Sequence, residues 1–304
     1  MGFMADMKPP AAFDSPAPTP LVRLELDPGT GIWCKLEYLN PSGSTKDRIA
    51  RYILEHALRG GLARPGDLVI EASSGSTSIA MALACARLGL RFLAVMPEGV
   101  TNERTLMIRA FGGAIRFTPR EAGIAGALRE SERLAEETGA FLPRQFSNPL
   151  NVEAHRRGTA QEILGVLPEV SAVVSGVGTG GTLVGLFEGC PGSIPVLARP
   201  VDHLTSDPEC CSFSARIPGV VDCVSQLFRE ERLPSLQTVE VAAGDAIAAA
   251  RRIIAAGFPV GPSSGLNYCA AAVTARRLGP GANVVTVFPD RMERYFSGEL
   301  FRGV

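Results

Sequence analysis

The chain contains 304 residues, a length that suggests two domains or one large domain. Its 30 basic and 31 acidic side chains give a net charge of −1, which argues against a basic nucleic-acid-binding surface. Hydrophobic residues make up 46% of the chain, which excludes a disordered protein, and no apolar run reaches the roughly 18 residues of a membrane span. We therefore expect no nucleic-acid partner and no membrane partner.

Cysteine and histidine usage points to a reducing compartment and away from a metal site. The seven cysteines are scattered and form no C-x-x-C motif, as expected for reduced thiols in a cytoplasm. The first residues lack the apolar stretch of a signal peptide, which also predicts a cytoplasmic protein. The three histidines, His56, His155 and His203, are too far apart in sequence to form a zinc-binding pair, so we expect no metal.

Short apolar runs alternate with segments of helical period from residue 44 onward. The predicted strands cover residues 68–70, 92–96, 115–117, 172–175, 194–198 and 284–288. The predicted helices cover residues 76–88, 101–111, 121–138, 152–166, 245–256 and 266–277, and another begins near residue 44. This alternation predicts an α/β fold of parallel sheets with helices on both faces. Residues 199–235 show no clear period.

Three turns rich in glycine and serine follow strands, at the sheet edge where α/β proteins bind ligands. The first is PSGSTKDR at residues 41–48, where Ser44 and Asp47 fit a capping box and predict a helix start. Lys46 then lies in the first helical turn, where the helix dipole opposes its charge. Partial burial would lower its pKa and leave the free amine that imine-forming lysines require. The alternative is a solvated lysine near a helix cap.

The second turn is EASSGSTS at residues 71–78, directly after the predicted strand 68–70. It brings five hydroxyl groups and several backbone N–H groups to a helix N-terminus, which can bind a carboxylate or a phosphate. A helix cap needs only one hydroxyl. The excess therefore favours a ligand site, with a serine-rich cap as the alternative.

The third turn is SGVGTGGT at residues 175–182, where glycines allow the backbone to approach an anion. Gly176, Gly178 and Gly181 formally match the G-x-G-x-x-G pattern of dinucleotide-binding proteins. That pattern requires an acidic residue about 20 positions later, at the end of the next strand. The next predicted strand is followed by Arg199, so the turn favours a single phosphate group. A nicotinamide-dependent oxidoreductase remains a distant alternative.

A fourth string, GPSSG at residues 261–265, matches the nucleophile turn of serine hydrolases. No histidine follows His203, which excludes the hydrolase order of catalytic residues, and Ser263 remains a hydrogen-bonding group at a helix start. The sequence thus offers an activatable amine, a phosphate site and a carboxylate site, without a metal. Pyridoxal phosphate, held by Lys46 and acting on an amino acid, would use all three.

Six motifs in order carry a resemblance to a known family: PSGSTKDR, EASSGSTS, QFSNP, GVGTGGT, GPSSG and PDRMERY. From about residue 15 to residue 300 the chain resembles the cysteine synthase family of fold type II pyridoxal-phosphate enzymes, which includes O-acetylserine and O-phosphoserine sulfhydrylases. The resemblance implies two domains with mainly parallel, twisted sheets covered by helices, as in the tryptophan synthase β-subunit. Residues 38–146 would form a smaller, mobile domain that closes over the substrate. Residues 1–37 and 147–304 would form the larger domain that binds the cofactor phosphate.

The resemblance also implies roles for individual residues. Lys46 would hold pyridoxal 5'-phosphate as an internal aldimine and move the α-proton. Ser76 would contact the cofactor ring, and Ser263 would face its pyridine nitrogen. The cofactor phosphate would be bound by Gly178, Thr179, Gly180, Gly181 and Thr182. The substrate carboxylate would be bound by the second turn and one glutamine, namely Ser73, Ser74, Gly75, Thr77 and Gln145.

The implied reaction is a β-replacement on O-acetyl- or O-phospho-L-serine through an aminoacrylate, with sulfide or a thiol as the nucleophile. The implied partners are a small-molecule amino-acid substrate and a second copy of the chain in a cytoplasmic homodimer. The sequence departs from the common T-S-G-N-T-G motif, because Ser76 stands in place of asparagine. The last motif and residues 199–229 also differ from those of housekeeping enzymes.

These departures motivate two further hypotheses. The first is a specialised synthase of secondary metabolism that adds an amine nucleophile, as in the formation of 2,3-diaminopropionate precursors. The second is a family member without catalytic activity that binds and regulates a partner. The presence of Lys46 in its motif argues against the second hypothesis.

Overall fold

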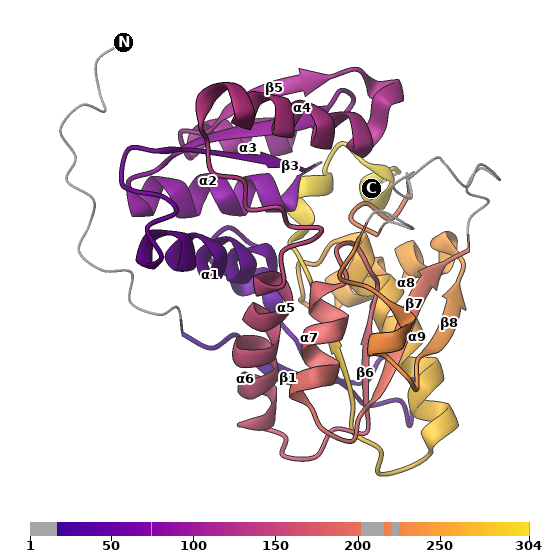
Figure 1. Ribbon diagram of the computed structural model, residues 1–304. Helices are drawn as coiled ribbons and strands as arrows, with labels where there is room; N and C mark the ends of the chain where they lie inside the picture. The colour runs from indigo at the N-terminus through magenta and orange to yellow at the C-terminus, as the bar shows by residue number, and fades with distance from the viewer. Residues whose placement is uncertain (1–16, 74, 202–215, 221–224, 304) are drawn as a thin grey trace.

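Two sheets, each covered by helices, form the two lobes of the computed structural model (Figure 1). The structure describes residues 17–73, 75–201, 216–220 and 225–303. The described part of the chain starts with β1 in the lower lobe, builds the upper lobe, and returns to complete the lower one (Figure 1). The α/β fold with mainly parallel strands is therefore confirmed.

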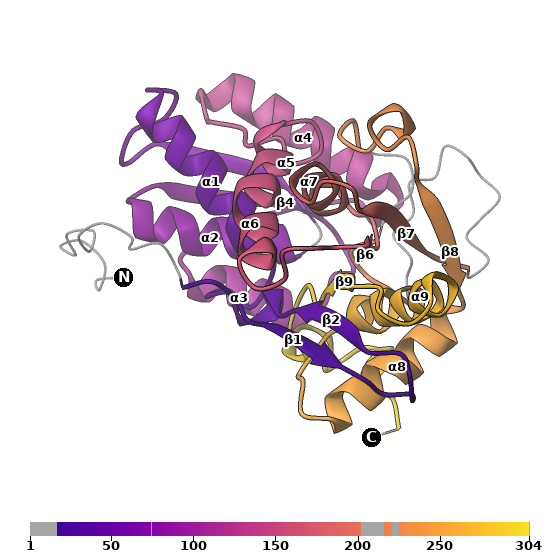
Figure 2. The same cartoon turned by 90° about the horizontal axis from the view of Figure 1, so that it is seen from below.

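Six strands form the larger sheet, in the order β1-β2-β9-β6-β7-β8 (Figure 2). β1 and β2 pair in antiparallel fashion, and every other pair in this sheet is parallel. Parallel strands place their carboxyl ends at one edge, so the segments that follow β6 and β9 meet there. The strands are Leu21–Leu24 (β1), Ile32–Lys35 (β2), Ala172–Ser175 (β6), Ile194–Pro200 (β7), Gln237–Val241 (β8) and Val284–Val287 (β9).

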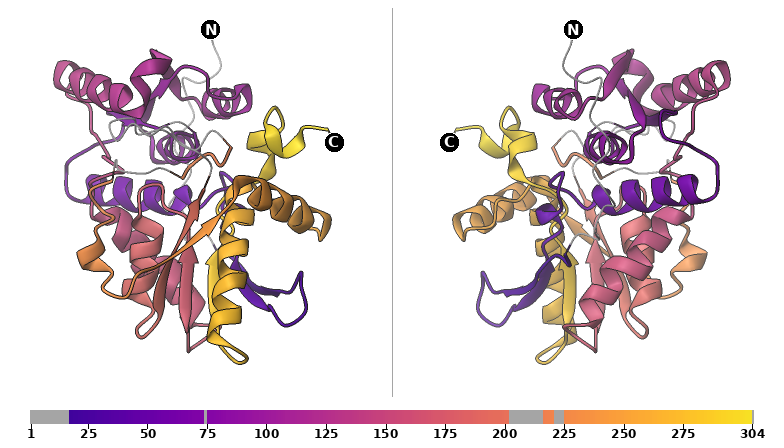
Figure 3. Two further views of the ribbon diagram at one scale, coloured as in Figure 1. Left: turned by 90° about the vertical axis from the view of Figure 1, so that its right-hand side faces the viewer. Right: turned by 90° about the vertical axis from the view of Figure 1, so that its left-hand side faces the viewer.

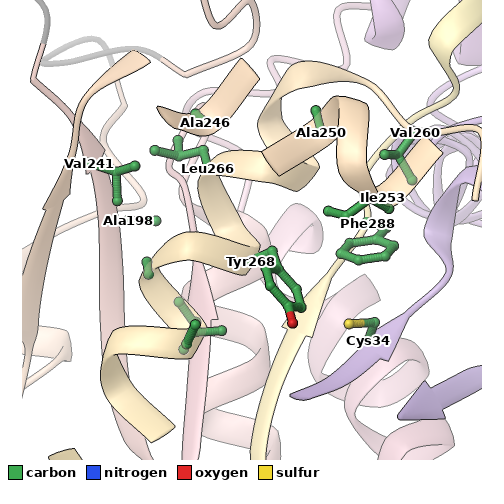
Figure 4. Close-up of a cluster of buried hydrophobic side chains, with 14 of the residues drawn as sticks. Cys34, Ala198, Val241, Ala246, Ala250, Ile253, Val260, Leu266, Tyr268 and Phe288 are labelled. Atoms are coloured by element: carbon green, nitrogen blue, oxygen red, sulfur yellow. The ribbon is translucent and has the colours of Figure 1, made fainter. Parts of the chain in front are cut away.

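Helices bury both faces of this sheet. Val174 belongs to the core cluster that contains Ala246 of α8 and Leu266 of α9 (Figure 4). Its neighbour Val173 belongs to a separate cluster that contains residues of α6 and α7. Successive strand residues point to opposite faces, so a strand buried on both faces is apolar throughout. The covering helices are α6 (Ala160–Leu164), α7 (Gly181–Gly189), α8 (Ala243–Ala255) and α9 (Pro262–Leu278).

The smaller sheet consists of three parallel strands in the order β3-β4-β5. Val69 packs toward α1, α2 and α3, and Ile70 packs toward α4 on the other face. The strands are Leu68–Ala72 (β3), Arg91–Pro97 (β4) and Ala114–Thr118 (β5). The helices are α1 (Lys46–Arg59), α2 (Ser76–Leu88), α3 (Asn102–Ala110) and α4 (Gly123–Thr138).

All six predicted strands are present, but the sequence analysis missed β1, β2 and β8. β1 and β2 are only four residues long, and β2 ends in Lys35, a charged residue that is nevertheless buried. β8 is an edge strand with exposed and buried residues in alternation, and it directly follows the segment 199–235 that showed no clear period. Short strands with charged or exposed residues give a weak hydrophobic signal.

The predicted helix over residues 152–166 is divided by a π-helical turn. α5 (Leu150–Ala154) runs into the turn η3 (His155–Thr159) and then into α6. A π turn shifts the residues that follow it around the helix axis, and such turns are frequent near functional sites. Here the turn contains His155, which is fully buried against α7.

The C-terminal segment joins the two lobes (Figure 3). It contains the short turns η5 (Met292–Tyr295) and η6 (Glu299–Phe301). The Thr101 hydroxyl donates to the Arg294 carbonyl oxygen at 3.2 Å, and the Ser297 amide donates to a Glu103 carboxylate oxygen at 3.0 Å. The end of the chain is thus bound to α3 of the smaller sheet.

A row of glycines on α7 allows α5, η3 and α6 to approach closely. Gly181, Gly185 and Gly189 recur every four residues on the same side of the helix. A Cβ atom would lie 1.9 Å from the Asn151 side chain at Gly181, 2.6 Å from His155 at Gly185, and 2.4 Å from Ala160 at Gly189. The absence of side chains on this face therefore sets the distance between the two helical segments.

We expect Gly185→Ala to lower the free energy of unfolding by about 1–3 kcal/mol, because the added methyl group meets the Val152 carbonyl oxygen at 2.6 Å as well as His155. Denaturant unfolding measures the change. Gly244→Ala is the matched control, since Gly244 in α8 has open space around its Cβ position. Equal stability of the Gly185→Ala variant and the wild type would show that the helices are not in close contact.

Candidate active site

Two adjoining cavities lie at the carboxyl ends of the parallel strands. The first is lined by the segments that follow β3 and β9, together with Gln145 and Arg104. The second is lined by the segments that follow β6 and β9, together with the start of α9. Both cavities are lined by Lys46, Ser76, Gly178, Thr179, Pro218, Gly219 and Asp290.

Lys46 is the first residue of α1 and reaches both cavities. The loop before it is anchored to the end of β9, because the Thr45 amide donates to the Pro289 carbonyl oxygen at 2.8 Å. Burial lowers the pKa of the Lys46 amine, whereas the Asp290 and Glu37 carboxylates act in the opposite direction. The direction of this shift is the one predicted from the sequence for a buried lysine.

The turn between β6 and α7 forms one wall of the second cavity. Gly180 has φ of +80°, a left-handed conformation that favours glycine, and α7 starts at the next residue. A Cβ atom at Gly178 would lie 2.4 Å from the Gly219 carbonyl oxygen. Backbone N–H groups at a helix N-terminus bind anions, and the hydroxyls of Thr179 and Thr182 add two donors.

The structure places most of the predicted phosphate-site residues in this second cavity. Gly178, Thr179, Gly180 and Thr182 line it, and Ser263 lines it from the start of α9. Gly181 does not line either cavity but packs against Asn151. Its contribution is therefore the close approach of α7 to α5.

Two polar residues of the α5–η3 segment support the turn, and the sequence analysis did not identify them. The Asn151 side-chain amide, through Nδ2, donates to the Thr179 hydroxyl at 3.0 Å and to the Gln145 backbone carbonyl oxygen at 2.8 Å. His155 Nε2 lies 3.2 Å from the Thr182 hydroxyl, and burial lowers the pKa of His155 to about 3, so the ring is neutral. Polar residues on the buried side of a predicted helix were the only signal in the sequence.

The turn after β3 forms a wall of the first cavity, with Gln145 beside it. This cavity is lined by four residues for which carboxylate binding was predicted, namely Ser73, Gly75, Thr77 and Gln145. The Thr77 hydroxyl donates to Gln145 Oε1 at 2.6 Å, and Gln145 Nε2 donates to the Ala72 carbonyl oxygen at 2.8 Å. None of the described side chains caps the start of α2, so its first amides remain available to an anion. Ser74, which was predicted to bind the same ligand, lies outside the described residues.

Glu71 lies beneath this turn and was also missed. Its carboxylate accepts hydrogen bonds from the Ala72 amide at 3.0 Å and the Gln145 amide at 3.1 Å. Burial raises the pKa of Glu71 to about 8, against the effect of these amides. Arg144, the residue before Gln145, has φ of +54°, which is unusual for a residue other than glycine. An acidic residue at the end of an apolar strand was the available signal.

Ser76 connects the two lobes across the site. Its hydroxyl donates to Asp290 Oδ2 at 3.1 Å, and the Tyr295 hydroxyl donates to the same oxygen at 2.7 Å. The Arg104 guanidinium lies over the Tyr295 ring, 5.4 Å from its centre. Asp290 therefore lies beside Ser76, and it lines both cavities together with Lys46.

The segment 199–229 was expected to differ from housekeeping enzymes, and residues 202–215 and 221–224 lie outside the described part of the chain. Its described residues cover the phosphate-site turn. Phe228 packs against Gly180, and the Ser225 hydroxyl lies 3.2 Å from the Phe146 carbonyl oxygen and within hydrogen-bonding distance of the Thr179 carbonyl oxygen.

The donors in the second cavity fit a phosphate-bearing ligand. They comprise a helix N-terminus, two threonine hydroxyls and the Thr45 hydroxyl, which is buried and has no hydrogen-bond partner among the described residues. Among those residues no three His, Cys, Asp or Glu side chains are arranged to hold a metal ion. A search of the same residues for a helix long and apolar enough to span a membrane finds none.

Comparisons with known proteins agree on one family. The family described as "Pyridoxal-phosphate dependent enzyme" matches residues 12–290. A probable cysteine synthase of Bacillus subtilis is 36% identical over 93% of this chain and 94% of its own. The crystal structure of an O-ureido-L-serine synthase has a TM-score of 0.85 and 34% identity, over 94% of this chain and 93% of that one. An O-acetylserine-dependent cystathionine β-synthase from Helicobacter pylori has a TM-score of 0.84 and 31% identity, over 93% and 95%.

Proposed function

Because the chain belongs to the cysteine synthase family of pyridoxal-phosphate-dependent enzymes, we propose that it replaces the β-substituent of an O-activated L-serine. O-acetyl-L-serine and O-phospho-L-serine are the donor substrates that we propose. The observation that carries this proposal is the position of Lys46, which lines both the first and the second cavity. An amino acid bound in the first cavity would thus lie next to a cofactor bound in the second.

The residues of the second cavity fit pyridoxal 5'-phosphate. We propose that the turn from Gly178 to Thr182 binds its phosphate, that Ser263 faces its pyridine nitrogen, and that Lys46 holds its aldehyde. Ser76 would contact the cofactor ring. When bound, this cofactor supplies an electron sink for negative charge at the α-carbon of the substrate. A neutral hydroxyl at Ser263 makes that sink a moderate one.

We propose that the first cavity binds the carboxylate of the donor substrate. The amides at the start of α2 and the side chains of Ser73, Thr77 and Gln145 would orient it, together with Ser74 and the backbone of Gly75. The bond from Thr77 to Gln145 holds these side chains in place before the substrate arrives. The free amine of Lys46 would then take the proton from the α-carbon.

The nucleophile is sulfide or a thiol in our first candidate, which the similarity to a cysteine synthase and an O-acetylserine-dependent cystathionine β-synthase supports. An amine nucleophile in a specialised synthase is the second candidate, which the change at Ser76 supports. The similarity to an O-ureido-L-serine synthase supports a specialised product. The comparisons favour pyridoxal phosphate over nicotinamide as the cofactor.

We also propose the domain organisation implied by the resemblance, in which residues 38–146 move toward the rest of the chain when the substrate binds. The Ser76–Asp290 hydrogen bond crosses between the two parts. A cytoplasmic homodimer is proposed on the strength of the family, and sedimentation would measure its oligomeric state.

Reduction of the holoenzyme with borohydride tests the proposal, since it converts a cofactor bound to a lysine into a stable adduct. The whole chain has only three lysines, Lys8, Lys35 and Lys46, so peptide mapping is unambiguous. We expect a pyridoxyl group on Lys46. Lys35 serves as an internal control, because it is buried, lines neither cavity and forms an ion pair with Glu162 at 2.7 Å. A label on Lys35 or Lys8 would contradict the assignment, and an unlabelled protein would favour a member without catalytic activity.

A further inference from the structure

The hydrogen bond between Ser76 and Asp290 points to a proton acceptor that the proposed reaction does not yet use. The Asp290 side chain is only 6% exposed but lines both cavities. Its Oδ2 accepts hydrogen bonds from Ser76 at 3.1 Å and from Tyr295 at 2.7 Å, while its Oδ1 has no hydrogen-bond partner within the described part of the chain. Both partners of Oδ2 are neutral hydroxyls, and no ion pair involves Asp290 among the described residues.

The groups around Asp290 make it the available base. Burial raises the pKa of Tyr295, and the nearby Asp290 raises it further, so the phenol stays protonated and acts as a donor. Lys46 would be occupied with the α-proton, and Arg104 over the Tyr295 ring is a permanent cation. Asp290 is the only carboxylate among the described residues that line the two cavities.

Ser76 gives a ligand a route to this carboxylate. Its side chain is partly exposed and lines both cavities, and its hydroxyl already donates to Asp290. A hydroxyl can accept one hydrogen bond while donating another. A ligand that donates an S–H or N–H bond to Ser76 Oγ would therefore be connected to Asp290. An asparagine amide at this position could not transfer a proton in the same way.

We propose that Ser76 and Asp290 form a proton relay that accepts the proton of the nucleophile, and that the second substrate is therefore one that arrives protonated and neutral. This inference rests on the proposed function and specifies the chemical class of its second substrate. A thiol or an N–H nucleophile fits the relay. Hydrosulfide fits less well, because it is already ionised and is repelled by the negative charge of Asp290.

A thiol and O-acetyl-L-serine illustrate the bonds and protons that change in this step. The O–Cβ bond of the donor breaks and acetate leaves, and an S–Cβ bond forms. The thiol proton passes to Ser76 Oγ while the serine proton passes to Asp290. Asp290 then releases one proton to water. For an N–H nucleophile, an N–Cβ bond forms and the same proton transfers follow.

Single-turnover measurements on Asp290→Asn test the relay. The first readout is acetate release from O-acetyl-L-serine without a nucleophile, and the second is the rate of product formation with 2-mercaptoethanol, 1,2,4-triazole or hydrosulfide. We expect the rates with the two neutral nucleophiles to fall about 100-fold, as for loss of a general base. The rate with hydrosulfide should change by less than about 3-fold, since no proton needs to be removed. Comparison of the wild-type rates with 2-mercaptoethanol and with 1,2,4-triazole distinguishes an S–H substrate from an N–H substrate.

The pH dependence separates a base from a structural group. In the Asp290→Asn variant the rate with the thiol should rise about tenfold per pH unit, because only the thiolate reacts, whereas the wild type should vary much less over the same range. Ser76→Ala should reproduce this profile, and Ser76→Thr should restore the wild-type profile because it retains the hydroxyl. Glu293→Gln is the matched control, since Glu293 pairs with Arg291 and lines neither cavity.

The outcomes distinguish the inference from the function on which it rests. If the wild type releases no acetate from O-acetyl- or phosphate from O-phospho-L-serine, the proposed function fails. If the wild type turns over but Asp290→Asn slows all three nucleophiles equally, or follows the wild-type pH profile, the relay is wrong and the proposed function stands.

Discussion

Replacement of Lys46 by alanine should lower kcat/KM for β-replacement by about 1,000-fold or more, the largest effect that we expect on activity. The variant lacks both the amine that would hold the cofactor and the base that would take the α-proton. The loss should appear mainly in kcat, because the carboxylate site at the start of α2 is unchanged. Steady-state kinetics with O-acetyl-L-serine and a thiol measure it.

Two comparisons make this result specific. Arg59 lies on the same helix, is exposed and lines neither cavity. The Arg59→Ala variant should therefore be as active as the wild type. Added methylamine should restore part of the activity of Lys46→Ala, since a free amine can replace the missing one. Turnover of Lys46→Ala at the wild-type rate would refute both the assignment of the lysine and the proposed mechanism.

Replacement of Arg48 by alanine should have the largest effect on stability, a loss of about 3–5 kcal/mol at neutral pH. Arg48 lies two residues after Lys46 and forms ion pairs with Glu37 at 2.6 Å and with Glu162 at 2.7 Å. Glu37 is fully buried, so the variant would leave an unpaired charge in the protein interior. Denaturant unfolding of the holoenzyme measures the loss.

Arg51→Ala is the matched control on the same helix. Arg51 pairs with Glu55 in the partly exposed i,i+4 geometry, which contributes only about 0.3–0.5 kcal/mol. A loss of similar size in the two variants would mean that the Glu37–Arg48 pair is no more important than a surface pair.

The pH dependence of the wild type follows from the same ion pair. Burial alone would raise the pKa of Glu37, but the Arg48 guanidinium outweighs it and lowers the pKa to about 2, from 4.5. A carboxyl group whose pKa is lowered in the folded state stabilises the fold at pH values above its pKa in the unfolded chain. This contribution is lost as the pH falls from about 4.5 toward 2. In Arg48→Ala the sign reverses, because protonation would relieve the unpaired charge. The difference in stability between the variant and the wild type should therefore shrink as the pH falls.

The features that could be predicted from the sequence are those that depend on neighbouring residues. The helix of residues 76–88 was predicted with its correct bounds, because its apolar run ends at Gly89, which has a left-handed conformation. The position of Lys46 in the first turn of a helix and the glycine turn before α7 were also predicted, because each depends on a short run of neighbouring residues. β1 and β2 were missed because they are stabilised by pairing with each other and with β9, which no local pattern reveals.

The supporting residues of the site could not be predicted because their partners are distant in sequence. Asn151 is 28 residues from Thr179, and Ser76 is 214 residues from Asp290. A hydrogen bond over such a separation depends on the tertiary fold and not on spacing. The resemblance to a family assigned roles to residues within motifs, whereas the contacts between motifs came from the structure.

The long sequence separation within the site has a consequence for the protein during its synthesis. At about 5–20 residues per second, a ribosome needs roughly 10–40 s to extend the chain across the 214 residues between Ser76 and Asp290. For roughly the second half of that time the nascent chain already contains Lys46 and the turn from Gly178 to Thr182, but it lacks the segment after β9 that anchors the loop before Lys46. Capture of the cofactor should therefore come only after the segment that follows β9 has been synthesised.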